Sequence, residues 1–123
     1  MKKLNVLLLV LLFGGALLAK TNLNNVSEVE DNLMIGLQSD NLGLKTSSAY
    51  YLGEYGSSKS VNALMSILKN GKTEEERISA AVALTKINSE KALFAVKQRA
   101  QFDESERVRK QCALCYQESS LTK

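Results

Sequence analysis

The sequence predicts an all-α fold, a right-handed α-α superhelix of about five short helices that follows an N-terminal signal segment. Two observations carry this prediction. Equivalent residues return every 32 positions, and apolar residues follow helical spacing between them in a chain that contains no proline. The equivalent residues are Lys45, Arg77 and Arg109, then Ala49, Ala81 and Ala113, and then Asn41, Thr73 and Ser105.

The N-terminal 19 residues have the pattern of a secretory signal peptide. Lys2 and Lys3 precede an apolar run from Leu4 to Ala19, after which the chain becomes polar. This run of 16 residues is shorter than the roughly 20 that a membrane-spanning helix needs. We therefore expect cleavage after Ala19, or alternatively after Ala16, rather than an uncleaved anchor. The mature protein is then periplasmic or secreted, and it touches a membrane only if the signal segment stays attached.

The rest of the chain is predicted to divide into a linker (20–27), a helical repeat domain (28–119) and a short tail (120–123). Ser27 is the expected N-cap of the first helix, and Gly71 is expected to end a later helix in the left-handed conformation. Two whole repeats are flanked by a half-repeat at each end. The helices of the whole repeats are predicted at about 42–55 and 60–69, and at about 73–87 and 90–101, and the closing half-repeat starts at 105.

The helix starts supply the strongest local evidence for the repeat. Asn41, Thr73 and Ser105 stand one period apart, and each has a side chain that accepts a hydrogen bond from a first-turn amide. Thr73 and Glu76 also have the spacing of a capping box. Three cap residues at a single period indicate a repeated unit.

Three segments carry a family resemblance: LKTSSAYYLGEYGSSKSVNAL (44–64), ERISAAVALTKINSEKALFAV (76–96) and VRKQCALCY (108–116). They resemble HEAT repeats, specifically the short bacterial type that is also found in phycobilisome lyase proteins. The chain departs from the family pattern at Thr85, where the family has a glycine, and at Ser57 and Ser89, where it has an aspartate. The resemblance covers about residues 28–118 and implies the solenoid fold. A lyase-like or chromophore-handling activity is implied by the resemblance alone.

The charge of the mature chain is nearly balanced. Lys2 and Lys3 leave with the signal, so 14 of the 16 basic residues face 13 acidic ones and the net charge falls from +3 to +1. Without a concentrated basic face, nucleic-acid binding is excluded. The chain has no histidine, and therefore no Ser–His or Cys–His pair. We expect no catalytic residue, no metal, no cofactor and no enzyme activity.

Cys112 and Cys115 form the only CxxC sequence in the chain. Cys112 shares its repeat position with Ala80, and Cys115 shares its position with Ala83. Because these positions face a neighbouring helix, the cysteines are expected to be small apolar fillers. An intermolecular disulfide and a thiol redox site are the alternatives.

Lys45, Arg77 and Arg109 form a ladder of cations at the repeat period. We expect them to form hydrogen bonds between repeats, or to pair with loop acids such as Asp40, Glu74 or Glu106. The functional alternative is a row of anion-binding residues. Exposed ion pairs of this kind contribute roughly 0–1 kcal/mol each.

The first helix of each repeat is predicted to carry apolar residues on its outward face when it is projected at about 100° per residue. Tyr50, Val82 and Leu114 share one repeat position, and Ile78 lies one turn before Val82. Solenoid helices are usually polar there, so these four residues are the candidate protein-binding surface. Isolated exposed apolar residues, or cover by residues 20–27, are the alternatives.

The function that these observations favour is an exported, non-catalytic scaffold that binds another protein. A homodimer through the uncovered terminal layer is a further expectation, because so short an array has few stacked units. The alternatives are the lyase-like or chromophore-handling accessory role and a thiol redox protein that uses Cys112 and Cys115.

Overall fold

The structure is a computed structural model, and it describes residues 25–122. The predicted signal peptide and residues 20–24 of the predicted linker lie outside the described residues. Residues 25–122 contain six α-helices and no strand, where about five helices were predicted. Two whole repeats and two flanking half-repeats account for all six. Within this part of the chain, no helix is long and apolar enough to cross a membrane.

The first helix covers residues 25–36. Ser27 therefore lies inside a helix, and the prediction that it is the N-cap is wrong. Its hydroxyl group suits a cap, but a residue caps a helix only where the preceding backbone is non-helical. Leu33 and Met34 pack against the hydrophobic core, and Leu37 is buried in it.

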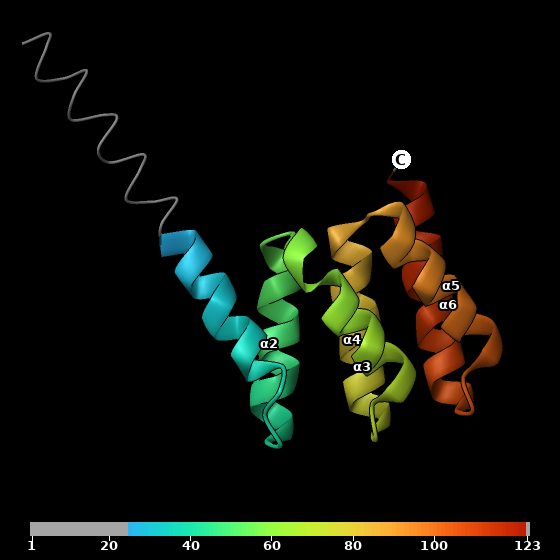
Figure 1. The fold of residues 1–123 in the computed structure, drawn as a ribbon. Helices are drawn as coiled ribbons and strands as arrows, with labels where there is room; N and C mark the ends of the chain where they lie inside the picture. Colours follow the sequence, from blue (N-terminus) through green and yellow to red (C-terminus); the bar gives the residue numbers. More distant parts are fainter. Residues whose placement is uncertain (1–24, 123) are drawn as a thin grey trace, which may run out of the picture. The chain divides into compact units, whose positions relative to one another are not determined.

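Five further helices and one short 3-10 turn complete the described chain. The helices form two layers in Figure 1, with α2, α4 and α6 in one layer and α3 and α5 in the other. Helix α4 contacts each of the other four, which makes it the centre of the fold. The elements are α2 (Leu42–Glu54), the 3-10 turn (Ser58–Ser60), α3 (Val61–Asn70), α4 (Glu74–Ile87), α5 (Glu90–Phe102) and α6 (Glu106–Leu121).

The predicted caps of α2, α4 and α6 are confirmed. Asn41 accepts a hydrogen bond from the amide of Leu44, and Ser105 accepts one from the amide of Val108. Thr73 caps α4, and both bonds of its capping box with Glu76 are present. Each helix of the α2, α4 and α6 layer therefore starts at the same position of the 32-residue period.

Gly71 ends α3 in an extended conformation (φ −55°, ψ 132°), so its predicted left-handed conformation is wrong. Among the described residues, Gly56 (φ 62°) and Asn88 (φ 59°) adopt the left-handed conformation. Gly71 is required for a different reason. A Cβ atom at this position would lie 2.6 Å from the carbonyl oxygen of Ile67 and 3.1 Å from Cγ of Arg77. The glycine thus provides space for the chain to pass between α3 and α4.

The core is built around the small residues of α4. Ala80, Ala81 and Ala83 have no exposed surface. A Cβ atom on Gly53 of α2 would lie 2.8 Å from Cα of Ala83, so these two helices pack backbone against backbone. Ala113 has the same repeat position as Ala81 but is exposed, because α6 is the last helix and nothing in the described chain packs on that side.

Candidate protein-binding site

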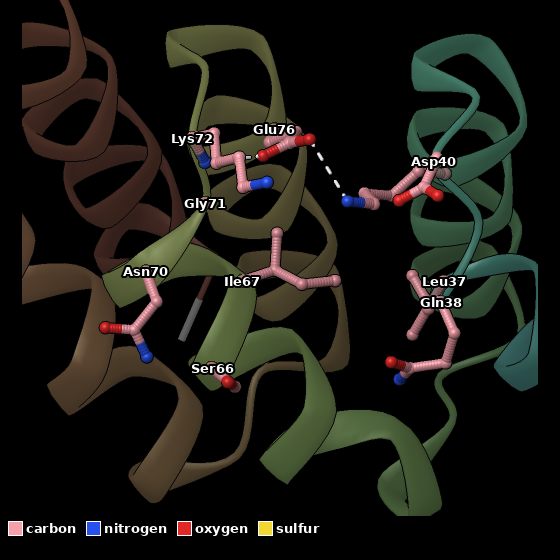
Figure 2. Close-up of a pocket in the computed structure, with 10 residues that line it drawn as sticks. Leu37, Gln38, Asp40, Ser66, Ile67, Asn70, Gly71, Lys72 and Glu76 are labelled. Atoms are coloured by element: carbon pink, nitrogen blue, oxygen red, sulfur yellow. Dashed lines mark hydrogen bonds and ion pairs between the residues drawn. The ribbon is translucent and has the colours of Figure 1, made fainter.

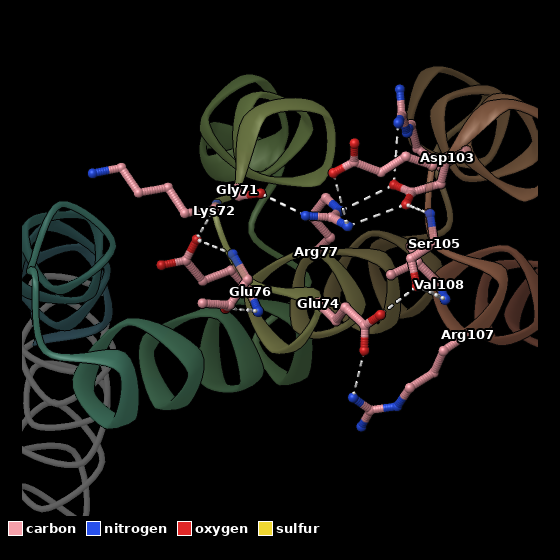
Figure 3. Close-up of polar contacts among 12 residues, drawn as sticks. Gly71, Lys72, Glu74, Glu76, Arg77, Asp103, Ser105, Arg107 and Val108 are labelled. Atoms are coloured by element: carbon pink, nitrogen blue, oxygen red, sulfur yellow. Dashed lines mark hydrogen bonds and ion pairs between the residues drawn. The ribbon is translucent and has the colours of Figure 1, made fainter.

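Arg77 is held inside the protein by two loops (Figure 3). Its Nε donates to Oδ2 of Asp103 at 3.0 Å, and its Nη2 donates to Oδ1 of Asp103 at 3.2 Å. Its Nη1 donates to the carbonyl oxygen of Gly71 at 2.8 Å. The side chain of Arg77 is 6% exposed and that of Asp103 is fully buried. Arg77 therefore joins the loop before α4 to the loop before α6.

The carboxylate of Asp103 accepts two further hydrogen bonds. Nη2 of Arg99 donates at 3.1 Å, and the amide of Ser105 donates at 2.9 Å. Burial raises the pKa of Asp103, but the bonds from Ser105, Arg77 and Arg99 outweigh it and hold the pKa below its ordinary value. The carboxylate is thus charged and fully engaged at neutral pH.

Lys45 and Arg77 bond between repeats, as expected, but the acids that they bind are not those that were named. Lys45 pairs with Glu76 at 3.1 Å, and Arg77 binds Asp103. Arg109 instead donates to the carbonyl oxygen of Asp103 at 2.6 Å, in the loop that precedes its own helix. Glu74, one of the predicted partners, accepts hydrogen bonds from Ser105 and Arg107. Lys45 and Arg77 therefore act in the joints between repeats.

The two cysteines are free and buried. Burial raises the pKa of Cys112 to about 12 and also raises the pKa of Cys115. Both thiols are therefore protonated at neutral pH, whereas thiol chemistry needs the thiolate. No group of three or more potential metal ligands occurs in residues 25–122.

The predicted outward surface is exposed only at its two ends. Tyr50 and Leu114 are about half exposed (48% and 52%). Ile78 and Val82 are half-buried and pack against the core. The centre of this candidate surface is therefore less exposed than its ends, because α4 lies between α2 and α6. The ammonium group of Lys86 also lies over the ring of Tyr50, 4.4 Å from its centroid.

A polar cavity of about 590 Å³ lies between residues 37–45, α3 and the start of α4 (Figure 2). Its charges are balanced, because its lining contains two cations, Lys45 and Lys72, and two acids, Asp40 and Glu76. Glu76 is already bound by Lys45 and by the amide of Lys72. This cavity therefore offers no excess of one charge and little apolar surface for a partner.

A second cavity of about 400 Å³, which we call the α3–α5 groove, has a different chemistry. Phe94 and Phe102 of α5 are 62% and 68% exposed, which is unusual for side chains of this size in one groove. Both of its charged residues are cations, one from each helix. The groove is lined by Met65, Lys69, Phe94, Ala95, Gln98, Arg99 and Phe102.

A basic recess of about 500 Å³ adjoins this groove. The two cavities share Lys69, Arg99 and Phe102, so they form one continuous surface. Lys72 and Arg77 add two cations to the wall of the recess, and the single acid in that wall is Glu104.

The α3–α5 groove was missed by the sequence reasoning. That reasoning projected only the first helix of each repeat, whereas the groove belongs to the second helices. A usable signal was present. Phe94 and Phe102 are the only phenylalanines after the predicted signal, and Gln98 stands midway between them, so all three share one face of a helix.

The chain consists of helix pairs that repeat at a constant period and stack on their neighbours. This arrangement defines an α-solenoid repeat protein. The family model for HEAT repeats matches residues 30–117. The chain therefore belongs to the HEAT repeat family, as the sequence resemblance indicated. HEAT repeats generally mediate protein–protein interactions as scaffolds, and the family is generally non-catalytic. No curated protein matches this chain.

Proposed function

We propose that this protein is an exported, non-catalytic scaffold that binds a partner protein through the α3–α5 groove. The observation that carries the proposal is the exposure of Phe94 and Phe102 in a single apolar groove. Aromatic side chains contribute a large share of the binding energy at protein interfaces, where a partner removes them from water. The groove replaces Tyr50, Ile78, Val82 and Leu114 as the leading candidate surface, since the central two are half-buried.

Photo-crosslinking in the cell tests the binding surface. A benzophenone amino acid at Phe94 should give a discrete adduct with a protein that mass spectrometry identifies. The same amino acid at Leu114, which is exposed on α6, is the matched control and should give none. An adduct from Leu114 alone would move the binding site to α6. Silence at both positions in folded protein would refute the scaffold function.

Export rests on the basic start of the chain and the apolar run that ends at Ala19. The intact mass of the protein, isolated from the periplasm or the medium, should correspond to a chain that begins at Lys20, or at Leu17 if cleavage follows Ala16. Recovery of only the full-length chain from the membrane would refute processing and indicate an anchor.

The other sequence-based hypotheses receive less support from the site. The lyase-like or chromophore-handling role of the phycobilisome lyase type rests on the resemblance alone, and a pigment absorbance band in the purified protein would be its signature. The buried, protonated thiols of Cys112 and Cys115 weigh against a redox role. A homodimer is compatible with the exposure of Leu114 and Leu121 on α6, and sedimentation over a range of concentrations tests it.

A further inference from the structure

We infer that the segment bound in the α3–α5 groove is an acidic amphipathic peptide of the partner protein. Its apolar side chains pack between Phe94 and Phe102, and its carboxylates face Lys69 beside them. This inference rests on the proposed scaffold function, and it adds the chemistry of the partner.

The lining of the groove is largely apolar. Met65 and Ala95 lie in its wall, with Phe94 and Phe102 largely exposed beside them. A groove between two neighbouring helices accommodates apolar anchors that project from one face of a peptide. The aliphatic part of the lining, Met65 and Ala95, suits the apolar side chains of a peptide.

The charged residues that line the groove and the recess are mostly cations. The groove and the recess together present Lys69, Lys72, Arg77 and Arg99 against the single acid Glu104. Asp103 neutralises part of this charge, because it binds both arginines. The side chain of Lys72 extends away from Arg77 and Asp103 in Figure 3. Lys69 remains: it is exposed, and the described chain supplies no ion pair to its ammonium group. It is the group that a partner's carboxylate can reach.

The position of Lys69 supports the same conclusion. Lys69 stands in the last turn of α3, where a cation interacts favourably with the helix dipole. It also lines both the groove and the basic recess. An unpaired positive charge therefore lies beside the apolar lining, which complements a peptide with apolar anchors and a flanking acid.

Fluorescence anisotropy with the purified protein tests the inference. The probe is a labelled amphipathic peptide of about 12 residues, with leucine and phenylalanine at positions i, i+4 and i+7 and glutamate elsewhere. Two control peptides keep the apolar residues and replace every glutamate with glutamine or with lysine. We expect the glutamate peptide to bind at least about tenfold more tightly than the glutamine peptide, and its affinity to fall as salt is added.

Three variants locate the binding. Lys69→Glu should weaken the glutamate peptide by about tenfold or more and leave the glutamine peptide nearly unchanged. Phe94→Ser should weaken both peptides, because it removes a shared apolar contact. Lys110→Glu is the charge-matched control, since Lys110 lies on α6 with an exposed side chain and pairs only with its neighbour Glu106. Circular dichroism confirms that each variant keeps its helices.

The outcomes separate this inference from the proposed function. Preference for the glutamine or lysine peptide would overturn the acidic assignment, while a Phe94 adduct in the cell would keep the scaffold function. Self-association that Phe94→Ser abolishes would replace the acidic peptide with a second copy of this chain. Binding that is unaffected by Lys69→Glu and by Phe94→Ser would overturn the inference altogether.

Discussion

The two joints between repeats occupy equivalent positions but are built differently. At the joint between α2 and α4, Lys45 makes one ion pair with Glu76, and the side chains are 20% and 10% exposed. At the joint between α4 and α6, Arg77 makes a two-point contact with Asp103, which is fully buried and also binds Arg99. The second joint is therefore a buried network, and the first is a single pair at the edge of the core.

The difference follows from one residue in the loop before each helix. Asp103 lies 26 positions after Arg77, and the residue 26 positions after Lys45 is Gly71. Because Gly71 has no side chain, Lys45 turns instead to Glu76. Gly71 cannot be an aspartate, since even a Cβ atom there would collide with the carbonyl oxygen of Ile67. Lys45 and Arg77 thus occupy equivalent helical positions but bind different partners.

The largest effect is expected from breaking the buried joint. Arg77→Met leaves the carboxylate of Asp103 buried without its main partner and should lower the free energy of unfolding by about 3–5 kcal/mol. Urea denaturation followed by circular dichroism measures this. A loss below about 1 kcal/mol would mean that the network at Asp103 contributes no more than a surface pair.

Acid should also weaken the joint at Asp103, but it should lower the free energy of unfolding less than Arg77→Met does. Protonation removes the charge of the Asp103 carboxylate and leaves both side chains in place. The pKa values of Asp103 and Glu76 are lowered from 3.8 and 4.5, since hydrogen bonds outweigh burial at both. Their stabilisation is thus present above these ordinary values and is lost as the pH falls through the lowered ones.

Urea denaturation at a series of pH values from neutral to about 3 measures this dependence. Arg77→Met should show a shallower acid loss, because without the two Arg77 bonds the buried Asp103 has a higher pKa. An unchanged slope in that variant would show that Asp103 does not carry the acid dependence.

A methyl group at the loop of the first joint should also destabilise the fold. Gly71→Ala forces the backbone near Ile67 to move and should cost about 1–3 kcal/mol. Gly56→Ala is the comparison variant, because its Cβ atom meets nothing within 4 Å and only its left-handed φ of 62° is strained. Its cost should be about 1 kcal/mol. Thermal unfolding of both variants measures these costs. An unchanged stability of Gly71→Ala would contradict the steric role of Gly71.

The smallest effect is expected at the single, partly buried pair of Lys45 and Glu76. Lys45→Met should cost at most about 1 kcal/mol, because Glu76 keeps its bonds from the amides of Lys72 and Thr73. The same urea experiment compares it directly with Arg77→Met. Equal losses for the two variants would erase the distinction between the joints.

The fold was predictable because its signals are local. A cap such as Thr73 needs only an amide three residues away, and the spacing of apolar residues follows from the helix geometry itself. The buried positions of Cys112 and Cys115 also follow from the period, since they match Ala80 and Ala83 of the central helix. Ser27 shows the limit of this reasoning, because a capping side chain does not decide where a helix begins.

The candidate site was less predictable because exposure depends on neighbours. Val82 and Leu114 share one repeat position, yet Val82 is half-buried and Leu114 is exposed, since α4 is flanked on both sides and α6 on one. Phe94 and Phe102 belong to the second helix of their repeat, and nothing in their spacing shows that α3 and α5 leave a groove between them. Only the packing of two helices at a set distance creates that groove.

By itself, the sequence determined the helical class, the 32-residue period, the N-caps of α2, α4 and α6, and the family, because each depends on contacts within a few residues or on repetition along the chain. The tertiary structure decided which acid each cation binds, why Gly71 must be a glycine, and which apolar side chains stay exposed. The reason is that these outcomes depend on distances between atoms some 30 residues apart, which stacking in three dimensions sets and a one-dimensional period does not encode.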